Sequence, residues 1–225
     1  MSTYPDRLGV FPLDGVVLFP HAHLPVHVAD SRDAALVADA LRRDGRLVLA
    51  ALRDRDTRVV RAPVHSTACA GCIIRHQRLN DDVAQIIVRG ERVVHLRETE
   101  CWDPFRVARL DAEEPERLRS RELARHRVRE LRELIERCCP GVFAKLERKL
   151  YHSPDEDGGL ELLNTLAAFL PVRMEKKLEW LQCECPQARW QDLRDTLVRM
   201  AEGRERKARV MARYEDLRPE RPRIN

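Results

Sequence analysis

The sequence is poor in the features that mark several common classes of protein. None of its glycines stands in a Gly-x4-Gly-Lys-Ser/Thr pattern, so no loop of backbone N–H groups for nucleotide phosphates is predicted. Aromatic residues make up only 5% of the chain, which leaves few platforms on which single-stranded nucleic acid could stack. No serine lies in a recognisable nucleophile motif; the serines are Ser2, Ser31, Ser66, Ser120 and Ser153. We therefore predict no catalytic residue, no enzymatic activity and no nucleic-acid partner.

Long hydrophobic runs are also missing. Residues 1–7 have no apolar segment behind them and do not form a secretory leader. The most apolar stretch, residues 160–170, carries Glu161 and Asn164 and is too short to span a bilayer. The seven cysteines are an odd, scattered set, which is typical of reduced thiols rather than of a disulfide framework. We therefore expect a cytoplasmic protein that makes no membrane contact.

Lysine is scarce, and arginine carries almost all the positive charge. The 41 basic residues are nearly balanced by 37 acidic ones, so the formal net charge is only +4. Charged residues make up 35% of the chain, which indicates helices with extensive solvated faces. The hydrophobic share of 44% is ordinary for a globular protein and suffices for one good core or two small ones.

Residues 1–110 have the pattern of a β-domain. Short runs rich in β-branched residues are separated by Gly, Pro and Asn-Asp turns; they cover 8–13, 16–20, 47–52, 73–74, 84–88 and 93–96. Residues 80–82 supply turn chemistry and predict a hairpin over residues 70–90. One helix interrupts the strands, with Asp30 or Ser31 as its cap and Gly45 at its end. Short strands with a single helix favour a compact, twisted barrel over a parallel α/β sheet.

Residues 111–215 have the pattern of a helical bundle. Apolar residues recur at helical spacing from about Pro115, again over residues 142–150 and 160–170, and from Met174 and Trp190 onward. The prolines fall between these segments, where they can begin a helix without interrupting one. Residues 216–225 are charged and rich in proline, and we predict a disordered tail there. The fold class is therefore α+β.

Several blocks of the first half also match one known family in their order and spacing. Residues 11–20, Phe-Pro-Leu-Asp-Gly-Val-Val-Leu-Phe-Pro, are followed by Leu-Pro-Val-His-Val at 24–28. Residues 71–81 and the Arg-Gly-Glu-Arg segment at 89–92 come next, and the helical segments at 163–170 and 175–181 match more weakly. Together these blocks resemble the N-terminal, substrate-recognition domain of the Lon family of ATP-dependent proteases.

The resemblance implies both a fold and a role. The implied fold is a PUA-like β-pseudobarrel with one inserted helix, followed by a helical bundle. The implied role is non-catalytic binding of unfolded or tagged protein segments, or of a partner protein. Since neither an ATPase nor a peptidase motif is found, we expect a free-standing form that acts as an adaptor or regulator in proteolysis or protein quality control. The alternative is an RNA-binding PUA-like protein, and the sequence would permit a homodimer.

The matching blocks also contain the candidate binding residues, which are Phe19, Pro20, Leu24, Pro25, Arg75, Arg89 and Arg92. Gly90 is expected to form a bulge or tight bend in the barrel wall. For Arg92, two alternatives stay open, namely a partly buried, paired guanidinium or an ordinary surface arginine.

One cluster has residue types that zinc favours. His65, Cys69, Cys72 and His76 supply two thiols and two imidazoles within a dozen residues. However, the segment enters a predicted strand, in which Cys69 and Cys72 would point to opposite faces. Structural zinc sites usually draw ligand pairs from separate turns. We therefore predict no metal and no cofactor, and keep these four residues as a minor zinc alternative.

Overall fold

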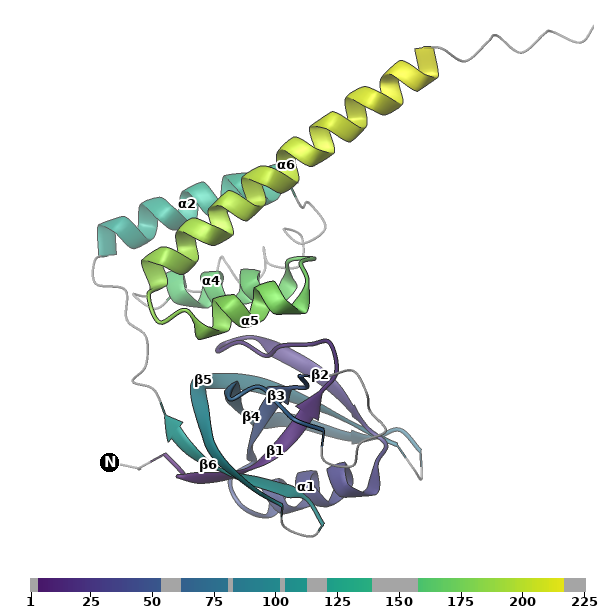
Figure 1. The fold of residues 1–225 in the computed structure, drawn as a ribbon, viewed down its shortest axis with the longest axis vertical. Helices are drawn as coiled ribbons and strands as arrows, with labels where there is room; N and C mark the ends of the chain where they lie inside the picture. The colour runs from purple at the N-terminus through teal and green to yellow at the C-terminus, as the bar shows by residue number, and fades with distance from the viewer. Residues whose placement is uncertain are drawn as a thin grey trace, which may run out of the picture.

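A six-stranded mixed sheet that closes on itself forms the N-terminal half of the protein (Figure 1). The computed structural model describes residues 4–53, 62–80, 83–101, 104–112, 121–138 and 158–216. The strands follow the order β2-β5-β4-β3-β1-β6, and β5 also pairs with β6. This extra pairing closes β1, β3, β4, β5 and β6 into a ring and leaves β2 outside it. The strands are β1 (Arg7–Leu13), β2 (His23–Val28), β3 (Arg46–Ala51), β4 (Thr67–Arg78), β5 (Ala84–Cys101) and β6 (Arg106–Ala112).

The one described helix of this half is α1 (Ser31–Arg42), as predicted. The carboxylate of Asp30 accepts a hydrogen bond from the Arg32 N–H at 2.7 Å and so caps the first turn. Gly45, with φ of 76°, takes the left-handed conformation that ends the helical segment. The chain then enters β3, which runs parallel to β1, while all the other strand pairs are antiparallel.

The ring of strands has a small interior and a larger apolar exterior. The buried interior side chains come from the five ring strands and are mostly short, such as Val48, Ala50, Ala68 and Ala70. Alternate residues of the same strands, such as Phe11 and Leu49, face the opposite way and join a second buried cluster. This second cluster also includes side chains of α1 and continues into the helical half of the protein.

The helical half comprises α2 (Arg121–Cys138), α4 (Gly158–Phe169), α5 (Met174–Gln182) and α6 (Pro186–Asp216). These helices lie on one side of the barrel, and α6 runs along α2 and extends beyond it (Figure 1). Leu166, Leu178 and Trp180 belong to the same buried cluster as Phe11 of the barrel. None of the described helices is long and apolar enough to cross a membrane. The α+β class is therefore confirmed, while the helix predicted at 142–150 and the tail from residue 217 lie outside the described residues.

Residues 16–20 form a loop that is buried from residue 17 onward, so the strand predicted there is wrong. Phe19 is fully buried, and its loop meets β5 at Gly90. The His21 N–H donates to the Gly90 carbonyl, and the Gly90 N–H donates to the Ala22 carbonyl, each at 2.9 Å. The apolar run is thus buried by packing against the barrel instead of by pairing within it. Gly90 also flanks a shift in the β4–β5 register, as expected of a bulge.

The predicted boundary at residue 110 falls inside β6, which runs to Ala112; α2 begins at Arg121. Buried apolar side chains connect the two halves. The division into a barrel domain and a helical domain therefore stays a proposal.

Candidate functional site

Strand β2 and the β4–β5 hairpin form an antiparallel sheet that extends from the ring. Residues directly opposite each other in such a ladder point to the same face. Pro25 pairs with Ile87, and Ile87 pairs with Arg75, so these three side chains form one row across the sheet. We call this side the outer face; it consists of His23, Pro25, His27, Cys72, Arg75, Gln77, Gln85, Ile87 and Arg89.

Burial alternates along these strands as it should for a sheet with one covered side. Val26, Val28, Ile86 and Val88 are buried on the inner side. On the outer face, the side chains of both arginines and both histidines are exposed, and no side chain of the face is acidic. The face is therefore basic, whereas the charge of the whole chain is nearly balanced.

The β4–β5 hairpin adds two exposed apolar side chains beside the outer face. Ile74 is the extra residue of a bulge between Ile73 and Arg75 and is 48% exposed. Leu79 precedes the turn and is also 48% exposed. The Asn80 side chain accepts a hydrogen bond from the Val83 N–H at 2.7 Å, which is the turn chemistry predicted from the sequence.

The candidate binding residues fall into different environments. Pro25, Arg75 and Arg89 lie together on the outer face. Leu24 points to the covered side and is partly buried. Phe19 and Pro20 are buried and so cannot contact a partner without movement of their loop. Sequence reasoning missed Ile74 and Ile87, because only the strand register shows that they lie beside the arginines.

Arg92 lies away from the outer face, in a cluster on the barrel wall. Its guanidinium lies 4.2 Å from the centre of the Tyr4 ring, and Arg46 lies 5.3 Å from the same ring. Of the two alternatives for Arg92, the structure supports a partly buried, paired side chain. Its contacts indicate a structural role.

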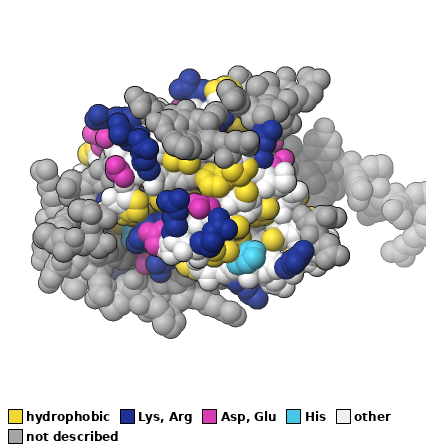
Figure 2. All heavy atoms as spheres, turned by 90° about the horizontal axis from the view of Figure 1, so that it is seen from below, with side chains coloured by type: hydrophobic (Ala, Val, Ile, Leu, Met, Phe, Trp, Pro, Cys, Tyr) yellow, Lys and Arg dark blue, Asp and Glu magenta, His cyan; other side chains and the backbone are white. Residues whose placement is uncertain are grey.

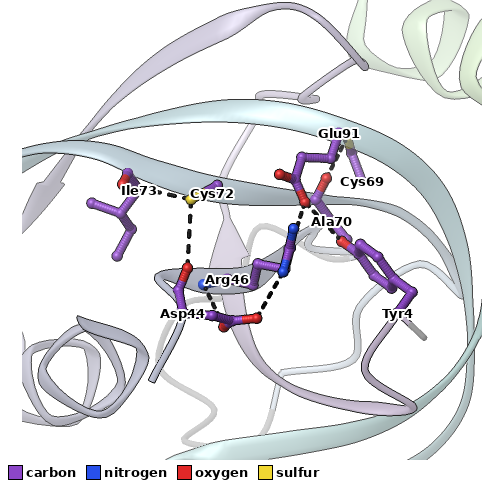
Figure 3. A network of polar contacts seen from close by, with 8 residues as sticks. All are labelled: Tyr4, Asp44, Arg46, Cys69, Ala70, Cys72, Ile73 and Glu91. Atoms are coloured by element: carbon purple, nitrogen blue, oxygen red, sulfur yellow. Dashed lines mark hydrogen bonds and ion pairs between the residues drawn. The ribbon is translucent and has the colours of Figure 1, made fainter. Parts of the chain in front are cut away.

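The same cluster contains a network of polar contacts (Figure 3). Arg46 donates from Nε to Glu91 at 2.7 Å and from a terminal nitrogen to Asp44 at 2.9 Å. The Tyr4 hydroxyl donates to the same Glu91 oxygen at 3.4 Å. Burial, and then the nearby Glu91 charge, raise the pKa of Tyr4 well above its ordinary value. Tyr4 therefore stays protonated near neutral pH, and we assign the network no acid–base chemistry.

The zinc candidates are not brought together. Cys69 is fully buried and its thiol faces the Ala70 carbonyl, whereas the Cys72 thiol faces the Asp44 carbonyl (Figure 3). His65 precedes β4, and His76 is exposed further along this strand. Among the described residues, no three metal-ligating side chains lie close enough together to hold a metal ion.

In the helical half, Arg189 is a buried cation that was not predicted from the sequence. It is only 1% exposed, donating to the Asn164 side chain at 2.7 Å and to the Cys183 carbonyl at 2.8 Å. These bonds tie α6 to α4 and to the segment between α5 and α6. A buried guanidinium with such partners holds helices together and is not available to a ligand.

Another surface, distinct from the outer face, lies at the α1 end of the molecule. Seen from below, this face shows apolar side chains with basic and acidic ones interleaved (Figure 2). On α1, Leu41 is 42% exposed, and Asp39 forms ion pairs with Arg42 and Arg43 at 3.6 and 3.1 Å. Because the charges are mixed here, this surface lacks the single-sign character of the outer face.

Comparison with known proteins points to one family. The family model described as "ATP-dependent protease La (LON) substrate-binding domain" matches residues 7–199. Lon protease 2 of Syntrophobacter fumaroxidans is 28% identical over 120 residues, which are 53% of this chain and 15% of that protein. Lon protease of Chloroherpeton thalassium is 28% identical over 119 residues, 51% of this chain and 14% of that protein. The chain thus matches only a small part of the length of these relatives.

Two solved structures share the fold. The N-terminal domain of Lon protease from the Mycobacterium avium complex has a TM-score of 0.64 and 18% identity; the similarity covers 85% of this chain and 98% of that one. A Lon N-terminal domain protein from Xanthomonas campestris has a TM-score of 0.59 and 23% identity, and the similarity covers 83% and 96% of the two chains. Both structures support the predicted pseudobarrel followed by helices.

Proposed function

Because the chain belongs to the Lon substrate-binding domain family, we propose that it is a non-catalytic module that binds protein segments destined for proteolysis. The observation that carries the proposal is the extent of the match, which runs from residue 7 to residue 199. It therefore includes every strand of the barrel and most of the helical half. A relation of this extent concerns the domain as a whole and not one shared motif.

The surface of the β4–β5 hairpin supports binding of unfolded chain. Ile74 and Leu79 are each 48% exposed; Ile74 directly precedes Arg75 of the outer face, and Leu79 lies four residues further along the hairpin. Unfolded or tagged segments expose apolar side chains that folded proteins bury, so a surface with exposed apolar residues can select them. The neighbouring charges keep such a surface soluble and select among sequences.

At a finer level, we propose that the chain acts as an adaptor or regulator of a protease. The relatives named Lon protease are far longer than the matching region. A module of this kind can present bound segments to a protease or compete with it for them. We assign no catalytic step to the residues of this chain.

Binding to a fluorescently labelled client protein tests the proposal; the client is prepared folded, with its disulfides intact, and unfolded, with its disulfides reduced and alkylated. We expect saturable binding of the unfolded form by anisotropy, and none of the folded form. The change Leu79→Ser should weaken binding about fivefold, because it removes apolar area worth about 1 kcal/mol at the interface. Leu41→Ser on α1 is the matched control, because Leu41 is similarly exposed on another surface. Equal binding of the folded and unfolded forms would refute the proposal.

The adaptor role needs its own measurement. Full-length Lon protease is given an unfolded substrate with and without this protein in excess. We expect the initial rate of degradation to change at least about twofold, and Leu79→Ser to reduce that change. An unchanged rate of degradation would refute the adaptor role, but it would not contradict the proposal that the chain binds unfolded segments.

A further inference from the structure

We infer that the open edge of β2 accepts an extended, acidic peptide as an added strand. This inference rests on the proposed function and assigns to it a place and a class of sequence. Strand β2 lies at one end of the strand order and pairs with β5 over its whole length. No described strand pairs with its other edge.

The hydrogen bonds of the ladder show which backbone groups of β2 point to the open edge. In an antiparallel pair, every second residue bonds to the partner strand and the residues between point away. The Gly90 N–H donates to the Ala22 carbonyl, so Ala22 is a bonded position. Every second residue from Ala22 continues this pattern, so the backbone groups of Leu24 and Val26 bond to β5. The backbone groups of Pro25 and His27 therefore point to the open edge.

Pro25 agrees with this assignment, because proline has no N–H to donate and is tolerated where the ladder does not need one. On an edge, proline also discourages uncontrolled pairing between molecules. Pro25 removes only one donor and keeps its carbonyl. His27 still offers both an N–H and a carbonyl to an incoming strand. The edge can therefore pair with an added strand, although with one hydrogen bond fewer at Pro25.

The charge of the outer face selects the peptide. A strand added to β2 would place alternate side chains on the outer face, beside His27 and within about one Debye length of Arg89. None of the outer-face side chains is acidic. In strand addition, specificity comes from alternate side chains of the bound peptide. Charge complementarity therefore favours a segment in which acidic residues alternate with apolar ones.

The same arginines could attract RNA, but the rest of the face does not suit it. Proteins that bind single-stranded RNA combine a basic groove with aromatic side chains on which the bases stack. The outer face has no Phe, Tyr or Trp. An open strand edge pairs with a peptide backbone and offers nothing comparable to a nucleotide. The observations therefore favour a peptide over RNA.

A matched pair of variants at one position tests the edge. His27→Ala keeps the outward N–H, whereas His27→Pro removes it; neither change removes a bond to β5. The probe is a labelled peptide of alternating Val and Glu, with a Val–Lys peptide and a single-stranded RNA oligonucleotide for comparison. We expect His27→Ala to bind the Val–Glu peptide within about twofold of the unaltered chain, and His27→Pro about fivefold more weakly, as for one lost hydrogen bond. Thermal unfolding of each variant checks that the barrel is intact.

If His27→Pro fails to fold, a second variant that should strengthen peptide binding still tests the inference. Pro25→Thr adds an outward donor, and we expect about fivefold tighter binding of the Val–Glu peptide. Equal binding by Pro25→Thr and the unaltered chain would overturn the inference, as would equal binding of the Val–Lys peptide or tighter binding of the RNA. If unfolded polypeptide binds but the Val–Glu peptide does not, the edge inference fails and the proposed function stands. If neither binds, both fail.

Discussion

Gly90 and Phe19 approach each other so closely that a Cβ atom at position 90 would lie 2.1 Å from the Phe19 carbonyl oxygen. Backbone hydrogen bonds of 2.9 Å on both sides of this contact hold the 19–22 loop on β5. Glycine is therefore required here for a close approach between two segments of main chain. Through this contact, the loop packs tightly against the barrel next to β2.

We predict that Gly90→Ala destabilises the protein by about 3 kcal/mol, since the loop must move and loses its hydrogen bonds. The free energy of unfolding in urea measures the effect. Gly203→Ala is the control: nothing lies within 4 Å of a Cβ there, and Gly203 is exposed in α6. Alanine at position 203 should stabilise the helix by about 1 kcal/mol. Equal effects at the two positions would contradict the packing of the loop.

Arg189 should be essential to the helical half. Replacing it with methionine leaves the Asn164 side chain and the Cys183 carbonyl without this buried donor. We predict a loss of about 3 kcal/mol in unfolding free energy. Arg173→Met, at an exposed position before α5, should change stability by less than about 0.5 kcal/mol. If both variants melt like the unaltered protein, Arg189 does not hold these helices together.

Asp33 should give stability a pH dependence. Burial first, and then the charge of Asp30, raise the pKa of Asp33 from 3.8 to about 6. The folded state thus binds the proton more tightly than the unfolded state, so this contribution to stability is complete below pH 3.8 and is lost as the pH rises through 6. Relative to the unaltered chain, Asp33→Asn should gain stability between these pH values and hold the gain above them. A carboxyl titration by NMR with a midpoint near 4 would contradict the raised pKa.

The cysteines should differ strongly in reactivity. Cys69 and Cys138 are 0% and 1% exposed, and burial raises the pKa of Cys69, whereas Cys185 is exposed. Since the thiolate is the reactive form, we predict that iodoacetamide modifies Cys185 at least about a hundredfold faster than Cys69 in the folded protein. Peptide mapping after timed alkylation gives the rates, and denaturant should remove most of the difference. Similar rates in the folded state would mean that Cys69 is accessible.

Local signals in the sequence were enough to predict some elements. Asp30 and Gly45 bracket α1 because a cap and a left-handed glycine act through their nearest neighbours. The strand predicted at 16–20 was wrong. An apolar run indicates that its residues are buried, but it does not distinguish a strand paired in the sheet from a loop packed against the barrel.

The candidate site depended on relations across the chain. Pro25 and Arg75 were named separately, but their common row with Ile87 exists only in the strand register. The burial of Arg189 likewise depends on Asn164, which lies 25 positions away in the sequence. Neither relation leaves a periodic pattern that a single sequence could reveal.

Mapping where an unfolded polypeptide binds tests the central claim most directly. A client that carries photoreactive groups is crosslinked to the intact chain, and the attachment points are read by mass spectrometry. We predict crosslinks concentrated in β2, in the β4–β5 hairpin near Ile74 and Leu79, and along Ile87 and Arg89. Crosslinks spread evenly over the surface, or concentrated around Leu41 on α1, would contradict the claim that this sheet is the binding site.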